Sequence, residues 1–369
     1  MNDKIIKLVA VGDLILGDHP FTLGHGVTTV SKDEGCDFIF EKIKTHLQEG
    51  DIVCGNLEGI ISPKKPNETG VAKNIFWGDS GCSSSLESAG FNCLFLANNH
   101  TAQHGQDALN RTCELLDNNN IKWTGYNPSD CSSKPVFFNI EDVNIGVLSY
   151  CDTQQYHLDN IILPIISEEK IEKDIFDLKK TCDVIIISLH WGDEFINYPS
   201  SEQIRLGRKI IDFGANLILG HHSHNMQGIE KYNNGLIVYS LGTFVIDLWK
   251  KDVRESVLFS CDITKKGVAD YNILPIFIND RFQPEVYEGE DSLSFMKKME
   301  LLSDNLNKEN YNLSDEYDKK YVKEVERLTR IDKFGHLLHY IKNIHRFNKK
   351  LLFENILLIL KRRILRKNI

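Results

Sequence analysis

Short apolar segments that end in polar turns occur five times along the chain. They span residues 5–11, 52–54, 93–97, 184–189 and 217–219, and each is followed closely by Asp, Asn, Glu or His residues. Near-continuous apolar segments are typical of strands that are buried on both faces of a sheet. Because ligand sites of α/β sheets lie outside the carboxyl ends of the strands, we expect the five polar turns to converge on one site.

Helical patterns alternate with these predicted strands. Apolar side chains recur at helical spacing over residues 38–47, 108–116 and 202–213, and residues 118–120 and Gly214 supply stop signals after the second and third segments. Further strand-like segments follow at 136–140, 144–150, 236–240, 256–263 and 271–278. The alternation predicts an α/β domain, and the later strands predict more than one sheet, as in a sandwich flanked by helices.

The last of the five turns is rich in histidine. Residues 220–224 read Gly-His-His-Ser-His, and neutral imidazole is a good ligand for Zn, Mn and Fe. In an extended segment, side chains two residues apart point the same way, so His222 and His224 are the better pair of ligands. A polar turn with surface histidines is the competing interpretation, and the four other polar strand ends favour the metal site.

Six sequence segments at these turns carry a family resemblance. They are VGDLILG (11–17), GNLEG (55–59), LANNHT (96–101), LHWGDEF (189–195), LGHHSHNMQGIE (219–230) and YSLGTF (239–244). In this order they resemble the CapA capsule-synthesis family, also called the poly-γ-glutamate capsule family, which is related to the calcineurin-like metallophosphatases. The resemblance covers roughly residues 5–280 and is specific because six segments occur in order.

The resemblance implies a four-layer α-β-β-α sandwich with a metal site at the strand ends. It implies metal ligands at Asp13, Glu58, Asn99, His190, His222 and His224. In the metallophosphatases the second segment supplies a bridging aspartate, and here it holds Glu58 with Asn56 beside it. Asn99 and His100 match an Asn-His motif, so both are predicted catalytic residues, with His100 as a general acid or phosphate contact. His221 is expected to be a neighbour rather than a ligand.

Two kinds of position depart from the family pattern. Metallophosphatases usually have a histidine two residues after the first aspartate, and this chain has Ile15 at that position. The number of bound metal ions therefore stays open at one or two. Glu194 or Asp193 is a candidate replacement for the missing ligand. Ala102, Gln103 and His104 follow the Asn-His motif where an aspartate is usual, and Thr243 stands in place of an asparagine. We expect these changes to alter substrate contacts. The predicted residues around the substrate are Asn56, Glu194, His104, Glu230 and Thr243.

A mixed set of Asp, Asn, Glu and His ligands suits a divalent Mn, Zn or Fe ion and favours hydrolysis by an activated water. We therefore expect a metal-dependent hydrolase of phosphoesters in capsule or exopolymer biosynthesis, with a capsule polymer or a phosphorylated precursor as substrate. Two alternatives stay open at this point. The chain could be a non-catalytic metal-binding or scaffold subunit of a poly-γ-glutamate synthesis assembly, or it could hydrolyse or transfer a γ-glutamyl amide.

Composition indicates the cellular compartment in which this chemistry takes place. The chain has 369 residues, of which 41% are hydrophobic and 26% charged, as in ordinary soluble proteins. Its nine cysteines are scattered without a Cys-x-x-Cys pair, and we expect free thiols in a reducing compartment. The first predicted strand begins within a few residues of Met1, which predicts a cytoplasmic protein.

The charge of the chain is unevenly distributed. Residues 319–369 contain 15 Lys and Arg and 4 Asp and Glu, a net charge of +11 within a chain of net charge −9. We expect an enzyme-like domain over residues 1–285 and a helical, basic C-terminal extension over 286–369. Residues 351–360 are mostly apolar and precede a basic cluster. The extension is therefore predicted to bind either an anionic membrane surface or a partner protein. Binding to the membrane would place the protein peripherally at the inner membrane surface. Nucleic acid is not an expected partner, because the main domain is acidic.

Overall fold

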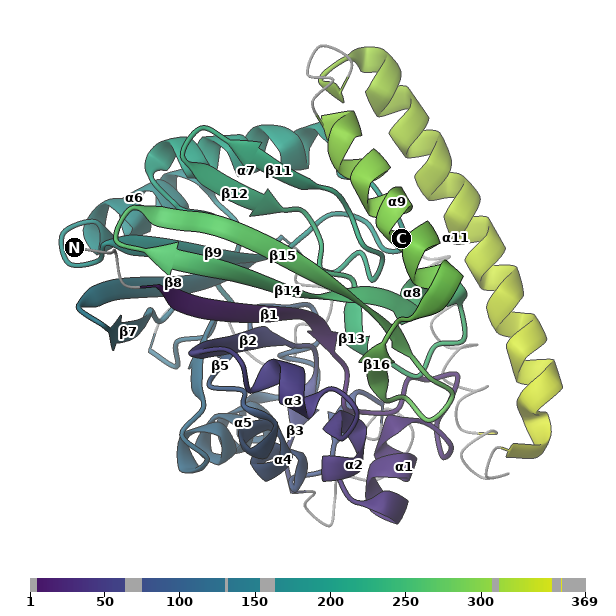
Figure 1. Ribbon diagram of the computed structural model, residues 1–369. Coiled ribbons are helices and arrows are strands. Elements are labelled where there is room, and N and C mark those ends of the chain that lie inside the picture. Colours follow the sequence, from purple (N-terminus) through teal and green to yellow (C-terminus); the bar gives the residue numbers. More distant parts are fainter. Residues whose placement is uncertain are drawn as a thin grey trace.

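The computed structural model describes residues 5–63, 75–129, 132–152, 163–306, 312–346 and 353. Two sheets pack face to face in it, with helices on both outer faces (Figure 1). The larger sheet has the order β16 (Pro284–Val286), β15 (Gly267–Ile278), β14 (Glu255–Thr264), β1 (Ile6–Leu14), β2 (Ile52–Leu57), β5 (Cys93–Phe95) and β6 (Lys122–Thr124), and β13 (Thr243–Val245) pairs with the end of β1. The neighbours β1, β2, β5 and β6 are parallel.

The second sheet has a parallel centre as well. Its order is β11 (Ile229–Tyr232), β12 (Gly235–Val238), β10 (Leu217–His221), β9 (Val184–His190), β8 (Val143–Cys151) and β7 (Val136–Ile140). The four strands β12, β10, β9 and β8 are parallel, and the edge strands are antiparallel. A separate small sheet pairs β3 (Ile60–Ile61) with β4 (Trp77–Gly78).

Helices cover both outer faces of the sandwich. The larger sheet carries α1 (Val27–Glu34), α2 (Asp37–Phe40), α3 (Lys44–Leu47), α4 (Cys82–Ala89) and α5 (Gln106–Asn118), and the second sheet carries α6 (Glu168–Leu178) and α7 (Ser201–Phe213). The short α8 (Lys251–Arg254) precedes β14. After the last strand come α9 (Gly289–Leu306), α11 (Asp315–Asn343) and the 3-10 turn η2 (Ile344–Arg346).

Three apolar clusters separate the four layers. Along β1, Leu8 and Ala10 face the cluster between the sheets, while Val9 and Val11 face the helices of the first outer layer. In β10, Leu217 and Leu219 likewise face the other sheet, whereas Ile218 packs under α6 and α7. Each strand therefore buries both faces, and full burial of one such side chain contributes about 1.5–3 kcal/mol. The predicted four-layer α-β-β-α sandwich is confirmed.

Local signals define most of the predicted elements. The helix expected at 202–213 is α7, which begins with a reciprocal cap between Ser200 and Gln203 and ends at Gly214 in a left-handed conformation (φ 119°). The prediction of one helix over 38–47 is wrong. Residues 41–43 form tight turns in which the amides of Glu41 and Ile43 donate to carbonyl oxygens three residues earlier, so the segment is divided into α2 and α3.

The C-terminal part begins against the sandwich. Phe295 and Met299 of α9 are buried in the cluster between the sheets, and α9 lies beside β11 and β15. The division of the chain at residue 286 stays a prediction. Among the described residues, no helix combines the length and apolar character needed to cross a membrane. The predicted helix and basic cluster over 351–367 lie outside the described residues, apart from Phe353.

Two of the eight described cysteines are in contact, and Cys131 lies outside the described residues. None of the eight forms a disulfide with another described cysteine. The Sγ atoms of Cys36 and Cys82 are 2.7 Å apart, and this contact, followed by burial, raises the pKa of Cys82 well above its usual range. Cys36 precedes α2 and Cys82 begins α4, so the contact joins two neighbouring helices of the outer layer.

We predict that the oxidant diamide converts this thiol pair into a disulfide, with loss of two hydrogen atoms. The bond would close a loop of the unfolded chain and raise the Tm by a few degrees. Peptide mapping and thermal unfolding would measure both effects. Cys36→Ser should abolish the cross-link, and Cys182→Ser, a half-buried thiol on the other outer face, should leave it intact. Recovery of only unpaired Cys36 and Cys82 peptides would contradict the prediction.

Candidate metal centre

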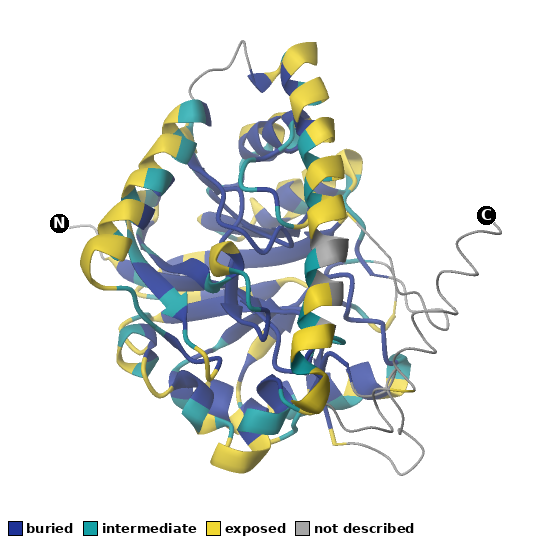
Figure 2. Ribbon diagram, turned by 90° about the vertical axis from the view of Figure 1, so that its right-hand side faces the viewer, coloured by how far each residue is buried: buried dark blue, intermediate teal, exposed yellow. Residues whose placement is uncertain are grey.

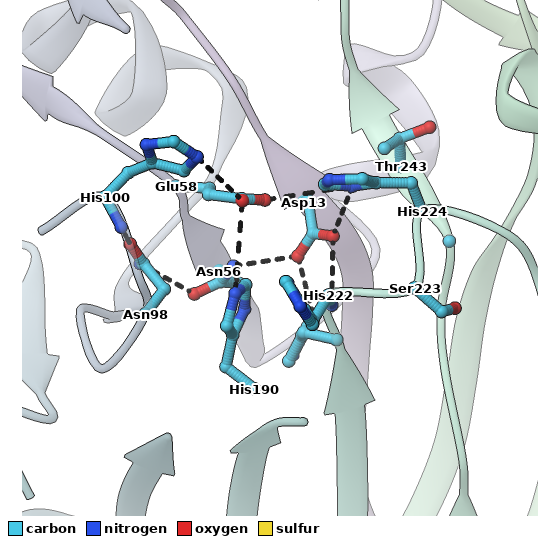
Figure 3. Close-up of polar contacts among 12 residues, drawn as sticks. Asp13, Asn56, Glu58, Asn98, His100, His190, His222, Ser223, His224 and Thr243 are labelled. Atoms are coloured by element: carbon cyan, nitrogen blue, oxygen red, sulfur yellow. Dashed lines mark hydrogen bonds and ion pairs between the residues drawn. The ribbon is translucent and has the colours of Figure 1, made fainter. Parts of the chain in front are cut away.

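The polar ends of five strands meet at one edge of the sandwich (Figure 3). The larger sheet contributes Asp13 from β1, Asn56 and the adjoining Glu58 from β2, and Asn99 and His100 from the turn after β5. The second sheet contributes His190 at the end of β9 and the histidines that end and follow β10. All of these side chains are buried. The predicted ligands of both sheets are therefore brought together.

Strand register places these side chains side by side. Asp13 pairs with Asn56 across β1 and β2, and His190 pairs with His221 across β9 and β10. Two glycines allow the backbones to approach at this edge. A Cβ atom on Gly12 would lie 2.2 Å from the carbonyl oxygen of Gly242, and one on Gly220 would lie 1.9 Å from that of Tyr239. Only glycine avoids these collisions.

Asn56 orients the acid and one of the histidines. Its Nδ2 donates to Oδ1 of Asp13 at 2.8 Å and lies 3.3 Å from Nδ1 of His190. Its Oδ1 accepts from Nδ2 of Asn98 at 3.1 Å, and Asn98 also donates to the carbonyl oxygen of Leu57 at 2.8 Å. Both amide side chains are fully buried. The two amides hold Asp13 and His190 in place through hydrogen bonds, and neither belongs to the groups of possible metal ligands.

Asp13 is stabilised as a carboxylate by the histidine turn. Its Oδ2 accepts from the backbone amide of His222 at 3.2 Å and from Nδ1 of His224 at 3.1 Å, and Nδ1 of His221 lies 3.3 Å from its Oδ1. Burial alone would raise the pKa of Asp13, but the nearby rings of His221 and His224 outweigh it and hold the pKa well below its usual range. His221, expected only as a neighbour, thus belongs to the charge balance of the site.

Glu58 has no comparable partners. Both of its carboxyl oxygens are buried without a hydrogen bond. Its Oε1 lies 3.8 Å from Nε2 of His100 and 3.9 Å from Nε2 of His190, and its Oε2 lies 3.9 Å from Nδ1 of His224. Burial raises the pKa of Glu58 well above its usual value. Such separations are too long for hydrogen bonds, but two ligands about 2.1 Å from one ion lie roughly 3–4 Å apart.

The donor atoms form two groups that share Glu58. One group consists of Asp13, Glu58 and His224, and the other of Glu58, His190 and His222. Asn99 adds an oxygen to the second group, since its Oδ1 lies 3.0 Å from Nε2 of His190. Oxygen and imidazole donors in these numbers fit a divalent Mn, Zn or Fe ion, and the unpaired carboxylate of Glu58 fits a ligand shared between two positions.

The histidines differ in protonation. Burial, followed by the charge of His224, lowers the pKa of His222 to about 3, and burial and His222 lower that of His190 well below its usual range. These two rings are neutral, as a metal ligand must be. Burial would also lower the pKa of His224, but Glu58 and Asp13 outweigh it and raise the pKa to about 9. In the protein without metal, a proton on His224 compensates part of the buried negative charge.

The turn after β10 is strained where the ligands lie. His222 (φ 90°) and His224 (φ 57°) both adopt left-handed backbone conformations. A residue other than glycine pays about 1–3 kcal/mol for such a conformation, and strain of this kind concentrates at functional sites. The hydrogen bond from the amide of His222 to Asp13 helps to hold the turn.

His100 is fixed at the rim of the cluster. Its Nδ1 lies 2.6 Å from Oε1 of Gln103, which can only accept, so this nitrogen carries the hydrogen and Nε2 is directed toward Glu58. Its ring stacks on Phe76 with centroids 3.9 Å apart, and Phe76 itself has a left-handed conformation (φ 54°). Phe76 was not predicted as part of the site, and Gln103 was expected only to alter substrate contacts.

The sequence of this chain is similar to those of capsule synthesis proteins. The family model described as bacterial capsule synthesis protein PGA_cap matches residues 7–248. This chain belongs to the PGA_cap family. It is 27% identical over 290 residues to the capsule biosynthesis protein CapA of Bacillus anthracis, covering 76% of this chain and 69% of that protein. It is 28% identical over 294 residues to the PGA biosynthesis protein CapA of Bacillus subtilis, covering 76% and 73%.

A solved structure with detectable similarity is the 5'-nucleotidase from Candida albicans, with a TM-score of 0.45 and 14% sequence identity. The match covers 91% of this PGA_cap chain and 59% of the nucleotidase. No conclusion about activity follows from a similarity at this level.

Several residues predicted to surround the substrate lie elsewhere in this PGA_cap chain. His104 packs beside Trp77, with its Nε2 at 2.8 Å from the carbonyl oxygen of Ile75. Glu230 forms a buried ion pair with Arg208 at 2.7 Å and accepts from the hydroxyl of Tyr239. Both therefore have structural partners outside the donor groups, because proximity in sequence does not fix the direction of a side chain.

The remaining predicted residues lie at the edge of the site. Thr243 pairs with Asp13 across β13 and β1, but its hydroxyl donates to the carbonyl oxygen of Val253. Glu194 is exposed and acts through its charge, which raises the pKa values of Glu58 and His224. Ile15 is buried in an apolar cluster with Phe76 and offers no donor atom.

We predict opposite effects of Glu58→Gln on metal binding and on metal-free stability. Without metal, folded Glu58 keeps its proton, whereas the unfolded chain loses it above a pH of about 4.3. The folded protein therefore loses stability as pH rises from there toward the raised pKa, and glutamine removes this loss. The metal-free variant should unfold at a higher temperature than the parent at about pH 8 and at a similar temperature near pH 4.

The same variant should bind Mn²⁺ at least about tenfold more weakly in calorimetric titration, because the shared carboxylate is lost. Glu169→Gln, which neutralises an exposed acid on α6, is the matched control and should change neither property. Unaltered Mn²⁺ affinity in Glu58→Gln would show that Glu58 is not a ligand.

Proposed function

We propose that this chain is a metal-dependent phosphoester hydrolase that acts in capsule or polyglutamate biosynthesis. The observation that carries the proposal is the buried, unpaired carboxylate of Glu58 between two groups of oxygen and imidazole donors. Membership of the PGA_cap family and the names of the two Bacillus relatives support the biosynthetic setting. The substrate class that follows is a phosphorylated precursor or an end of the polymer.

Each side chain has a defined part in this proposal. Asp13 and His224 hold one metal position, Asn99, His190 and His222 hold the other, and Glu58 is shared. A divalent ion, when bound, supplies a Lewis acid and a water that ionises near neutral pH. The second position has four donors and the first has three, since Ile15 contributes none. We infer that an ion binds more tightly at the second position.

His100 is the proton donor in this proposal. Its Nδ1 is held by Gln103 and its Nε2 lies beside Glu58, at the rim of both donor groups. From there a protonated Nε2 can deliver a proton to the oxygen of the departing alcohol, a contribution of about 10²- to 10⁴-fold in rate. Stacking on Phe76 restrains the ring in this orientation. Asn56 and Asn98 take no part in proton transfer and keep Asp13 in place.

We predict that His100→Ala lowers the turnover of phenyl phosphate by about 10²-fold or more with Mn²⁺ present. The loss should be much smaller for p-nitrophenyl phosphate, because the nitrophenolate departs without a proton. Steady-state kinetics on both esters measures this difference, and metal analysis should show unchanged content. A surface variant, His46→Ala, is the control for loss of a histidine.

The outcome separates the proposal from its alternatives. Equal losses on both esters would argue against proton donation by His100. A parent protein that binds metal but turns over neither ester would overturn the phosphoesterase proposal. In that case hydrolysis of a γ-glutamyl amide, or a scaffold role, would be the remaining function of the site.

A further inference from the structure

Helix α11 crosses the edge of the sandwich that carries the metal centre (Figures 1 and 2). Near its start, the hydroxyl of Tyr317 donates to the carbonyl oxygen of Pro199 at 2.6 Å, and Tyr317 and Tyr321 pack edge-on against Tyr198. Near its end, the ring of His339 stacks on Trp249 with centroids 3.5 Å apart. The helix is thus attached at two points to loops that follow β9 and β13.

These two loops border the metal centre. In the loop after β9, the amide of Phe195 donates to the carbonyl oxygen of Ser223, and the ring of Phe195 lies 5.9 Å from that of His224. In the loop after β13, Nζ of Lys250 lies 3.9 Å above the ring of Phe195. A surface that approaches the outer side of α11 therefore also approaches the edge where the donor groups lie.

The outer side of α11 and η2 carries large apolar side chains. Ile331, Leu338, Ile341 and Ile344 are 52%, 41%, 61% and 56% exposed. Around the helix, Ile341 and Ile344 lie opposite the buried Tyr321 and the half-buried His339, and Ile331 and Leu338 lie on one flank of this face. Figure 2 shows most of α11 exposed along its length. An apolar face of this kind on a terminal helix indicates a binding surface.

Cations accompany this apolar face. Lys342 and Arg346 are exposed at its C-terminal end, and Arg330 is exposed at its start. Residues 327–369 contain 12 Lys and Arg and 2 Asp and Glu, a net charge of +10, so the preceding residues carry −19. The 23 residues after η2 continue the same mixture of apolar and basic positions. An apolar stripe bordered by cations is the pattern of helices that lie in the surface of an anionic membrane.

We propose that the outer face of α11 docks on an anionic lipid surface. Its apolar side chains would enter the acyl boundary while Arg330 and Lys342, which are both exposed, contact acidic headgroups. A second copy of the chain is a poorer occupant, because pairing of two such helices would bring together two segments, residues 327–346, that each carry a net charge of +4. Docking in this way would turn the metal-centre edge toward the lipid. The inference that the substrate is met at the membrane surface rests on the proposed function, whereas docking itself does not.

Flotation of the full chain with phospholipid vesicles tests the proposal. The protein should float with vesicles of phosphatidylcholine and phosphatidylglycerol and remain behind with vesicles of phosphatidylcholine alone. High salt should weaken the binding several-fold, because headgroup contacts are screened. The double variant Leu338→Asp/Ile341→Asp should lower the bound fraction about tenfold or more. Arg330→Glu/Lys342→Glu should lower binding and reduce its dependence on salt.

Phe176→Asp is the matched control, since Phe176 is 64% exposed on α6, a helix on the opposite side of the sandwich from α11 (Figure 1). It should float like the parent. Circular dichroism and Mn²⁺ titration should show that all variants are folded with an intact metal centre. Parent protein that ignores anionic vesicles, or a double variant that floats like the parent, would overturn the proposal. So would a dimer that Leu338→Asp/Ile341→Asp dissociates without any vesicle binding.

Discussion

Asp13 and Glu58 place two carboxyl groups in one buried region. The hydrogen bonds and histidine rings around them follow from the free-energy cost of burying negative charge. A buried carboxylate is stable only when donors or cations compensate it. Asp13 receives an amide side chain, a backbone amide and an imidazole, and its pKa falls. Glu58 receives no hydrogen bond, and its pKa rises. The difference marks Glu58 as the group whose ionised form a bound cation would compensate, since the described residues offer it no hydrogen bond and the charge of His224, 3.9 Å away, is shared with Asp13.

The sandwich produces this arrangement through strand register. Parallel pairing of β1 with β2 and of β9 with β10 brings the ends of four strands to one edge, and each end contributes a side chain to the same buried region. The close approach of residues 239–242 to β1 and β10 there depends on Gly12 and Gly220. The strained turn after β10 then directs the backbone amide of His222 and Nδ1 of His224 to the same oxygen of Asp13, Oδ2. The stability of the apolar layers offsets the cost of a strained and charged edge.

Much of this was predictable from the sequence because strands buried on both faces leave a continuous apolar signal, and polar residues directly after them mark the ligand edge. The strand and helix segments and the four layers followed from that signal. The helix over 38–47 did not, since apolar spacing alone does not show where tight turns divide a helix. Asn98 and Phe76 were missed because their roles depend on contacts with β2 and with a ring more than twenty residues away in sequence. Gln103 was expected to alter substrate contacts, but its hydrogen bond with His100 depends on the turn after β5 and was not predicted. His104 and Glu230 lay in the matching segments, but their side chains point to other partners.

Ring contacts connect α11 with the rim of the metal centre. His100 stacks on Phe76, and the series continues through His19, Phe21, Trp249 and His339, with successive centroids between 3.5 and 6.3 Å apart. Packed rings resist independent displacement, because protein interiors are close-packed. The position of α11 and the orientation of His100 are therefore set within one packed layer. Among its described residues, α11 contributes no ligand atom to the metal centre. Through these ring contacts it still helps to hold His100, the proposed proton donor.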